Sequence, residues 1–197
     1  MLKRALDLVI AVSVAALLGP LMLLIALLVK LDSKGPVLFM QNRLGRSGAV
    51  FQMYKFRTMV QNAEQMGTGL FSYEDDPRVT RIGRILRYAS LDELPQVVNV
   101  LKGDMSIVGP RPPVTYELGN YADFPPELKH RFTVRPGITG LAQLSGRNDL
   151  NWDRKLVFDT EYIRKYHCYG VAYDLYLILK TVWVVLSMRN VIEKQSN

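Results

Sequence analysis

The sequence predicts an α/β fold of the mixed α+β kind: a mostly helical small domain with a short β-hairpin, an N-terminal re-entrant membrane helix and interfacial amphipathic helices. Three observations predict it. An uncharged apolar run fills residues 8–29, two strand-like segments flank Gly45 and Gly48, and the rest of the chain alternates helical periodicity with Gly and Pro. We therefore expect a membrane helix over residues 1–30 and one domain over residues 31–197.

The composition excludes several classes of protein. The chain of 197 residues has a formal net charge of +7, which suits an anionic partner such as nucleic acid, lipid head groups or a phosphorylated substrate. Cys168 is the only cysteine, so an internal disulfide and a cysteine-rich zinc module are excluded. The two histidines, His130 and His167, are too scattered for a histidine metal site. A metal ion would be a hard ion held by carboxylate and phosphate oxygens.

The first element is the apolar run Leu8–Val29, which as a straight helix would reach roughly 33 Å. Gly19 and Pro20 lie in its middle, and Pro20 predicts a kink there because it removes a helical amide. Basic residues flank both ends, and a helix that enters and returns keeps both flanks on one side of the membrane. The basic residues are Lys3, Arg4, Lys30, Lys34, Arg43 and Arg46. The pattern favours a re-entrant helix over a kinked full span, and both over a cleaved signal peptide.

A β-hairpin is predicted from residues 37–41 and 49–57. The alternation of the second strand places Phe51, Met53, Lys55 and Arg57 on one face, which is apolar at its start and cationic at its end. The cationic end is suited to a phosphate, although a solvated strand end is the simpler explanation.

An amphipathic helix is predicted over residues 78–88. Val79, Ile82, Ile85 and Leu86 form its apolar stripe, and an arginine recurs at every third position along its flank. These arginines are Arg78, Arg81, Arg84 and Arg87. Such an edge can lie against lipid phosphates or direct Arg87 into a site, and a solvated helix face is the ordinary alternative.

Two adjacent carboxylates, Asp92 and Glu93, follow that helix. Ser90 and Glu93 have capping-box spacing before a helix over residues 94–103, although Pro95 fits a cap at Asp92 better. Local stabilisation of a helix terminus is the simpler account of the acidic pair. Mutual repulsion would nevertheless separate their pKa values, leaving one as nucleophile or metal ligand and the other as a proton-handling group.

Arg111 stands in a proline-rich loop after a short strand at residues 105–108. Pro110, Pro112 and Pro113 restrict the backbone around Arg111, whose planar donor fork matches phosphate. We interpret this fixed cation as functional. Residues 135–140 predict a second rigid turn, followed by Gln143 and Arg147; its glycines suit either close approach to a ligand or a plain type II turn.

Two helices are predicted at the C-terminal end. The first covers residues 151–166, with Asp159, Tyr162 and Tyr166 on one side. The second covers residues 174–188, is strongly apolar and is broken by Lys180. Its longest closing uncharged run is too short to span a bilayer, so we expect it to pack on the domain or lie in the membrane interface.

Five motifs in one order give the sequence a family resemblance. They are Asp-Ser-Lys-Gly-Pro-Val at 32–37, Tyr-Lys-Phe-Arg-Thr-Met at 54–59, Ser-Leu-Asp-Glu-Leu-Pro-Gln at 90–96, Gly-Asp-Met-Ser-Ile-Val-Gly-Pro-Arg-Pro at 103–112 and Arg-Pro-Gly-Ile-Thr-Gly-Leu-Ala-Gln at 135–143. Together they resemble the bacterial sugar transferases, the monotopic phosphoglycosyl transferases, over nearly the whole chain. The length resembles that of the small members of the family.

The resemblance implies transfer of sugar-1-phosphate from a UDP-sugar to undecaprenyl phosphate, with release of UMP and with Mg²⁺ as cofactor. Carried onto this sequence, it implies that Asp92 attacks the phosphate that bears the sugar and lies close to the metal. It also implies that Glu93 assists proton handling and that Arg111, between Pro110 and Pro112, contacts the nucleotide. Further phosphate contacts are expected from Lys55, Arg57 and Arg87, and then from Thr139, Gln143 and Arg147.

The resemblance also implies a monotopic protein on the cytoplasmic face of the bacterial inner membrane, with a catalytic domain over residues 31–197. Gly19 departs from the family, in which a serine commonly precedes the proline of the re-entrant helix. Membrane lipid is an expected partner, nucleic acid is not, and a homodimer through the apolar C-terminal helix stays open. The competing hypothesis is a non-catalytic membrane-anchored anion-binding module, supported by the +7 charge. Against it, Asp92 and Glu93 would repel a nucleic-acid backbone.

Overall fold

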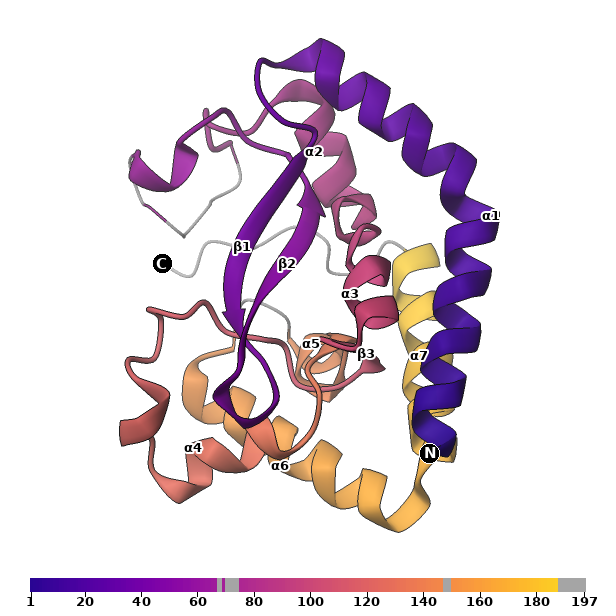
Figure 1. Cartoon of the computed structure of the whole chain (residues 1–197), viewed down its shortest axis with the longest axis vertical. Coiled ribbons are helices and arrows are strands. Elements are labelled where there is room, and N and C mark those ends of the chain that lie inside the picture. The colour runs from indigo at the N-terminus through magenta and orange to yellow at the C-terminus, as the bar shows by residue number, and fades with distance from the viewer. Residues whose placement is uncertain (67–68, 70–74, 147–149, 188–197) are drawn as a thin grey trace.

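The computed structural model describes residues 1–66, 69, 75–146 and 150–187. One long helix, α1 (Leu2–Asp32), runs along one side of a smaller body that contains a two-stranded hairpin, a short parallel strand pair and several helices (Figure 1). The mixed α+β prediction is confirmed. Within the described residues, the elements are mostly helical and the two sheets have two strands each.

Helix α1 is long and apolar enough to cross a membrane, by length and composition. Much of its apolar surface is exposed, including Leu2, Val9, Val12, Leu17, Leu23, Leu24, Leu27 and Leu31. It is one helix through Gly19 and Pro20, so Pro20 does not end it, and in Figure 1 it bows away from the body. Both of its ends pack against that body: Ala11 joins a core with Met53 and Val100, and Ile25 and Val29 join another with Phe56.

The predicted hairpin is present. Strands β1 (Leu38–Leu44) and β2 (Val50–Phe56) pair antiparallel, from Leu38 opposite Phe56 to Leu44 opposite Val50. The turn between them contains a 3₁₀ segment, Arg46–Gly48. The side chains of Met53 and Phe56 in β2 are buried, and β2 ends one residue before Arg57.

The helix predicted over residues 78–88 is shorter in the structure. Helix α2 (Arg81–Tyr88) begins after Thr80, whose hydroxyl accepts a hydrogen bond from the Gly83 amide. Arg78 lies outside the helix and forms a buried ion pair with Asp76 at 2.6 Å. Of the predicted apolar stripe, Ile82 and Leu86 pack in the core that contains Ile25, whereas Ile85 is 61% exposed.

The second predicted turn is a strand. Residues Gly137–Thr139 form β4, which pairs parallel with β3 (Ser106–Val108). The glycines permit backbone contact between segments of the chain itself: a Cβ on Gly137 would lie 2.0 Å from the Gly109 nitrogen, and one on Gly140 would lie 2.3 Å from the Gly109 oxygen. Glycines are thus required here because the backbone at residues 137 and 140 lies directly against the backbone of Gly109.

Short helices α3 (Gln96–Lys102) and α4 (Pro126–His130) lie between strands, and α5 (Leu141–Ser145) follows β4. The two C-terminal helices are longer than predicted, α6 (Trp152–Tyr169) and α7 (Val171–Leu186), and Lys180 does not break α7. Tyr162 and Ile163 of α6 form a core with Val108 and Leu177. Helix α7 thus packs on the domain, and it lies beside the N-terminal half of α1 (Figure 1).

Candidate active site

The acidic pair lies in a tight turn between α2 and α3. Residues Leu91–Glu93 form a 3₁₀ segment, and Ser90 before it has a left-handed backbone with φ of 57°. The Ser90 side chain makes no capping hydrogen bond, and α3 begins only at Gln96, after Pro95. The expected capping box is therefore wrong, as is a cap at Asp92, because the tight turn separates these residues from the helix.

Glu93 joins two cations from different elements. One of its oxygens accepts hydrogen bonds from Lys55 of β2 and from Arg111, both at 2.7 Å. Its other oxygen lies 3.4 Å from a second Arg111 nitrogen. Burial alone would raise the pKa of Glu93, but Arg111 and Lys55 together hold this pKa well below its ordinary value. Glu93 is thus ionised at neutral pH and fixes the position of both cations.

Asp92 has a different environment. Its residue is 8% exposed, and its carboxylate accepts no hydrogen bond from the part of the chain that the structure describes. Burial raises its pKa above the ordinary value, and the negative charge of Glu93 adds to this. Lys55, Arg87 and Arg111 oppose the shift without reversing it. The predicted separation of the two pKa values is present: burial dominates at Asp92, and ion pairing dominates at Glu93.

The loop that carries Arg111 is held by its own carbonyl groups. Arg131 donates to the Arg111 carbonyl at 2.7 Å, and Arg43 donates to the Pro112 carbonyl at 2.8 Å. Arg131 is itself fixed by an ion pair with Asp159 at 2.9 Å. Pro110 and Pro112 line a small cavity of about 10 Å³ beside Arg111. Three prolines and the hydrogen bonds from Arg131 and Arg43 thus fix the backbone position from which the Arg111 side chain reaches Glu93.

Arg57, which the sequence analysis expects to contact phosphate, has a different position. Its guanidinium is 5% exposed and donates to the backbone carbonyls of Val29, Ser33 and Pro36. These carbonyls lie at the end of α1 and in the segment that follows. The donors of Arg57 thus serve the junction between α1 and the hairpin, and this geometry does not favour the expected phosphate contact.

The remaining expected contacts are less close to the acidic pair. Thr139 is buried, with its hydroxyl 2.8 Å from that of Thr181 in α7. Gln143 donates at 3.5 Å to the Ile138 carbonyl, and its side-chain oxygen is buried without a partner among the described residues. Arg147 lies outside the described residues. The structure therefore brings together Lys55, Arg87, Asp92, Glu93 and Arg111, and places Thr139 and Gln143 around β4.

Three cations near this cluster were not among the site residues predicted from the sequence. Arg43 is partly buried, and desolvation together with the charge of Arg111 lowers its pKa to about 10. Arg131 and Lys155 both stack over the Trp152 ring, at 5.0 and 4.9 Å from its centroid. Burial and the charges of Arg111 and Arg131 lower the pKa of Lys155. No local motif marks these residues, since their proximity to Arg111 arises only from the tertiary fold.

Comparison with known proteins identifies a family for this chain. The family model described as "Bacterial sugar transferase" matches residues 1–188. The chain belongs to the bacterial sugar transferase family. The acidic pair, Lys55 and the Arg111 loop all lie within the matched part of the chain, and they are the residues that the fold brings together.

Individual relatives have names that agree with the family. The chain is 45% identical to a UDP-glucose:undecaprenyl-phosphate glucose-1-phosphate transferase of Caulobacter vibrioides, over 95% of this chain and 71% of that protein. It is 41% identical to an exopolysaccharide production protein of Sinorhizobium fredii, over 95% of this chain and 86% of that protein. An undecaprenyl-phosphate galactose phosphotransferase of Salmonella typhimurium is 40% identical over 94% of this chain. The chain spans 40% of that protein's length, less than half.

The residues of the cluster suit a magnesium ion that takes one ligand from the protein and the others from a bound substrate and water. In the part of the chain that the structure describes, no three His, Cys, Asp or Glu side chains form a group that could hold a metal. Glu93 is occupied by two cations, which leaves Asp92 as the available carboxylate. Because Mg²⁺ commonly binds one or two carboxylates and completes its shell with water and substrate phosphates, a single carboxylate fits this ion.

Proposed function

We propose that this chain is a phosphoglycosyl transferase that moves sugar-1-phosphate from a UDP-sugar to undecaprenyl phosphate, with release of UMP. The observation that carries the proposal is the contrast within the acidic pair. Asp92 is a buried carboxylate without hydrogen bonds from the described residues, whereas Glu93 beside it fixes Lys55 and Arg111. A little-solvated carboxylate beside cations that suit phosphate is an arrangement that can serve covalent phosphotransfer. The names of the relatives support the same reaction.

The proposed first step uses Asp92 as nucleophile. A carboxylate oxygen bonds to the phosphorus that carries the sugar, the bond from that phosphorus to UMP breaks, and its electron pair leaves on the UMP oxygen. Arg111 and Lys55 would stabilise the charge that develops on the phosphate oxygens. In the second step an oxygen of undecaprenyl phosphate attacks the same phosphorus, and the electron pair of the aspartyl bond returns to Asp92.

Glu93 takes a role in this scheme that depends on substrate. Its pKa is low because Arg111 and Lys55 bind it, so in the free protein it is a weak base. Substrate phosphates that draw these two cations away would raise the pKa of Glu93. Glu93 would then accept the proton of the lipid phosphate in the second step, only while substrate is bound.

Magnesium, when bound, would neutralise charge on the diphosphate and on the departing UMP. Asp92 is the residue that would hold it, together with substrate oxygens. The residues themselves supply the other functions: Arg111 and Lys55 orient the phosphates, and burial leaves the Asp92 carboxylate little solvated.

We also propose that the domain lies on the cytoplasmic face of the bacterial inner membrane, with α1 entering and leaving by the same side. Near its start, the Asp7 carboxylate accepts the Ile107 amide at 3.0 Å. At its end, the Asp32 carboxylate accepts the Ile82 amide, also at 3.0 Å. Because both ends bind one small domain, a straight passage across a bilayer would have to break one of these contacts. This supports a monotopic arrangement.

The decisive experiment is nucleotide release. Full-length protein in nanodiscs is given Mg²⁺, undecaprenyl phosphate and a panel of UDP-sugars, with Asp92→Asn alongside. We expect UMP with at least one sugar and none above background with Asp92→Asn. Release of UDP would mean transfer of the sugar without its phosphate and would overturn the proposal. Absence of release across the panel would favour an anion-binding module.

A further inference from the structure

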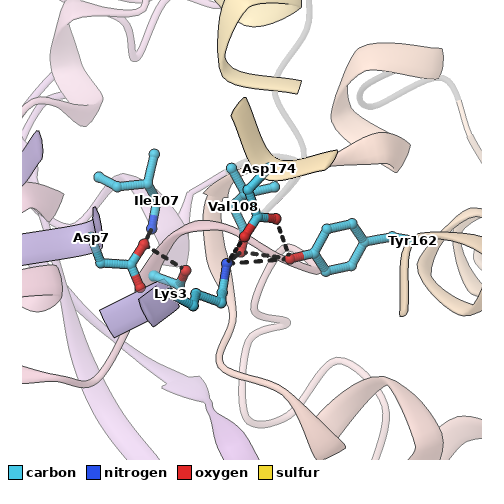
Figure 2. A network of polar contacts seen from close by, with 7 residues as sticks. Lys3, Asp7, Ile107, Val108, Tyr162 and Asp174 are labelled. Atoms are coloured by element: carbon cyan, nitrogen blue, oxygen red, sulfur yellow. Dashed lines mark hydrogen bonds and ion pairs between the residues drawn. The ribbon is translucent and has the colours of Figure 1, made fainter. Parts of the chain in front are cut away.

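The first turns of α1 are fixed to the strand that leads into the Arg111 loop. Lys3 donates to the Val108 carbonyl at 3.0 Å and to the Asp174 carboxylate of α7 at 2.7 Å (Figure 2). The Tyr162 hydroxyl lies 3.1 Å from the same carbonyl and 2.9 Å from the other Asp174 oxygen. Residues of α1 and α6 therefore both donate to the Val108 carbonyl, and Asp174 of α7 binds both of these donors.

A second contact fixes the same strand one turn further along α1. One carboxylate oxygen of Asp7 accepts hydrogen bonds from the Ser106 hydroxyl at 2.9 Å and from the Ile107 amide at 3.0 Å (Figure 2). Every residue of β3 is thus bound by a polar side chain of α1. The network is buried: Asp7 is 3% exposed and the Asp174 side chain 1%. Loss of one partner would leave another polar group without solvent or a hydrogen bond.

Strand β3 ends at Val108, three residues before Arg111, and the intervening backbone is stiff. Carbonyls along this segment are bound by groups from separate elements, namely Val108 by Lys3, Pro110 by the Gly137 amide, Arg111 by Arg131, Pro112 by Arg43 and Pro113 by the Leu44 amide. Because prolines on both sides of Arg111 also fix their own φ angles, the segment has few alternative arrangements, and its bound carbonyls, that of Val108 among them, together set where the Arg111 side chain leaves the backbone.

We propose that Lys3 is a positioning residue for Arg111. Lys3 sits in the membrane-entering helix and touches no residue of the acidic cluster in the described part of the chain. It acts through the Val108 carbonyl, which sets the start of the loop whose arginine binds Glu93. The position of Arg111 in the phosphate site thus depends on the hydrogen bonds that the first turn of α1 makes to the domain. The effect on turnover rests on the proposed function, whereas the effect on the loop does not.

The test is a double-mutant cycle on the full-length protein in nanodiscs. Lys3→Met, which removes the ammonium and keeps the length of the side chain, is combined with Arg111→Lys. Lys30→Met is the matched control, since Lys30 lies on the same helix and, among the described residues, donates only to the Gly35 carbonyl. We expect Lys3→Met to lower kcat/KM by about ten- to a hundredfold in the wild-type background and by less than about twofold in the Arg111→Lys background. Lys30→Met stays within about twofold of wild type in both.

Amide hydrogen exchange provides a readout that does not need turnover. We expect faster exchange in residues 106–114 of Lys3→Met, with no change there in Lys30→Met. If Lys3→Met does not fold, Tyr162→Phe removes one hydroxyl from the Val108 carbonyl and keeps the ring, and it should show the same changes at smaller size.

The outcomes separate this proposal from the proposed function. If Lys3→Met lowers kcat/KM equally in the two backgrounds, Lys3 has a general structural role and the positioning proposal is overturned. Unchanged amide exchange in residues 106–114 of Lys3→Met would also overturn the proposal. A wild-type protein that releases no UMP would overturn the proposed function, and exchange in residues 106–114 would then decide the positioning proposal alone.

Discussion

The carboxylate of Glu93 and the guanidinium of Arg111 form an ion pair at 2.7 Å. This contact joins the 3₁₀ turn after α2 to the proline-rich loop after β3. It explains why the pKa values of two adjacent acids shift in opposite directions. Ion pairs with Arg111 and Lys55 lower the pKa of Glu93, whereas burial raises the pKa of Asp92. The first two predictions follow from this difference.

The Glu93 ion pairs should stabilise the fold in a pH-dependent manner. The pKa of Glu93 is lower in the folded protein than its ordinary value of 4.5, so the stabilisation is complete above that value and declines as the pH falls below it. We expect Glu93→Gln to lower the free energy of unfolding by about 1 to 2 kcal/mol at neutral pH, because both cations are part-exposed. Denaturant unfolding over a pH series should show the gap to wild type narrowing in acid. A gap that is constant with pH, or one that also appears for the exposed control Glu127→Gln, would contradict this.

Asp92→Asn should gain stability as it loses activity. Burial raises the pKa of Asp92, so its ionised form is unfavourable in the folded state, and stability falls as the pH rises through the folded pKa. The neutral, isosteric amide removes this cost. At neutral pH we expect a higher unfolding midpoint than wild type, a difference that disappears in acid, and turnover reduced by at least about a thousandfold.

The matched control for that measurement is Asp123→Asn, at an exposed carboxylate outside the cluster. It should change neither turnover nor the midpoint appreciably. An Asp92→Asn protein that is less stable than wild type at neutral pH would refute the account of its burial.

Arg57 and Lys55, two residues apart, should have opposite phenotypes. Arg57→Lys leaves carbonyls at the end of α1 without donors, since one ammonium cannot replace the guanidinium fork, and should lower the free energy of unfolding by about 2 to 4 kcal/mol. Its kcat per folded molecule should be near that of wild type. Lys55→Met, which removes a cation from Glu93, should instead reduce kcat/KM strongly with a smaller change in stability. Thermal unfolding and steady-state kinetics on both variants check this, and the reverse assignment would refute it.

Both ends of α1 should face the same side of the membrane. In a Cys168→Ser background, Leu2→Cys and Lys34→Cys should react with a membrane-impermeant maleimide in cytoplasmic-side-out vesicles, and not in intact spheroplasts. Leu17→Cys, at an exposed apolar position in mid-helix, should be protected in both preparations. Reaction of the two end positions from opposite sides would indicate a full span.

Local sequence patterns predicted those parts of the site that depend on local structure. Alternation of apolar residues placed Lys55 on the same face of the second strand as Met53, which is buried in the structure, and the prolines around Arg111 indicated a fixed cation. The adjacency of Asp92 and Glu93 indicated separated pKa values only as an alternative to stabilisation of a helix terminus, and with mutual repulsion as the cause, whereas in the structure burial and ion pairing separate the two pKa values.

Other features depend on partners that are distant in the sequence. Arg57 follows the same strand pattern as Lys55, yet its donors meet carbonyls near the end of α1, which no periodicity reveals. The segment Gly137–Thr139 has the composition of a turn and becomes a strand only because β3 lies beside it. Lys3 has the sequence context of a membrane-flanking charge, and its contact with Val108 spans 105 positions.

The most direct test of the central claim is a single-turnover reaction without lipid acceptor. The wild-type protein is mixed with Mg²⁺ and the UDP-sugar that supports turnover, and UMP release and intact protein mass are followed together. The account predicts one UMP per protein molecule and a mass increase of one sugar phosphate, both absent in Asp92→Asn, with the adduct lost when undecaprenyl phosphate is added. UMP release that begins only when the acceptor is present, with no adduct at any time, would contradict a covalent role for Asp92.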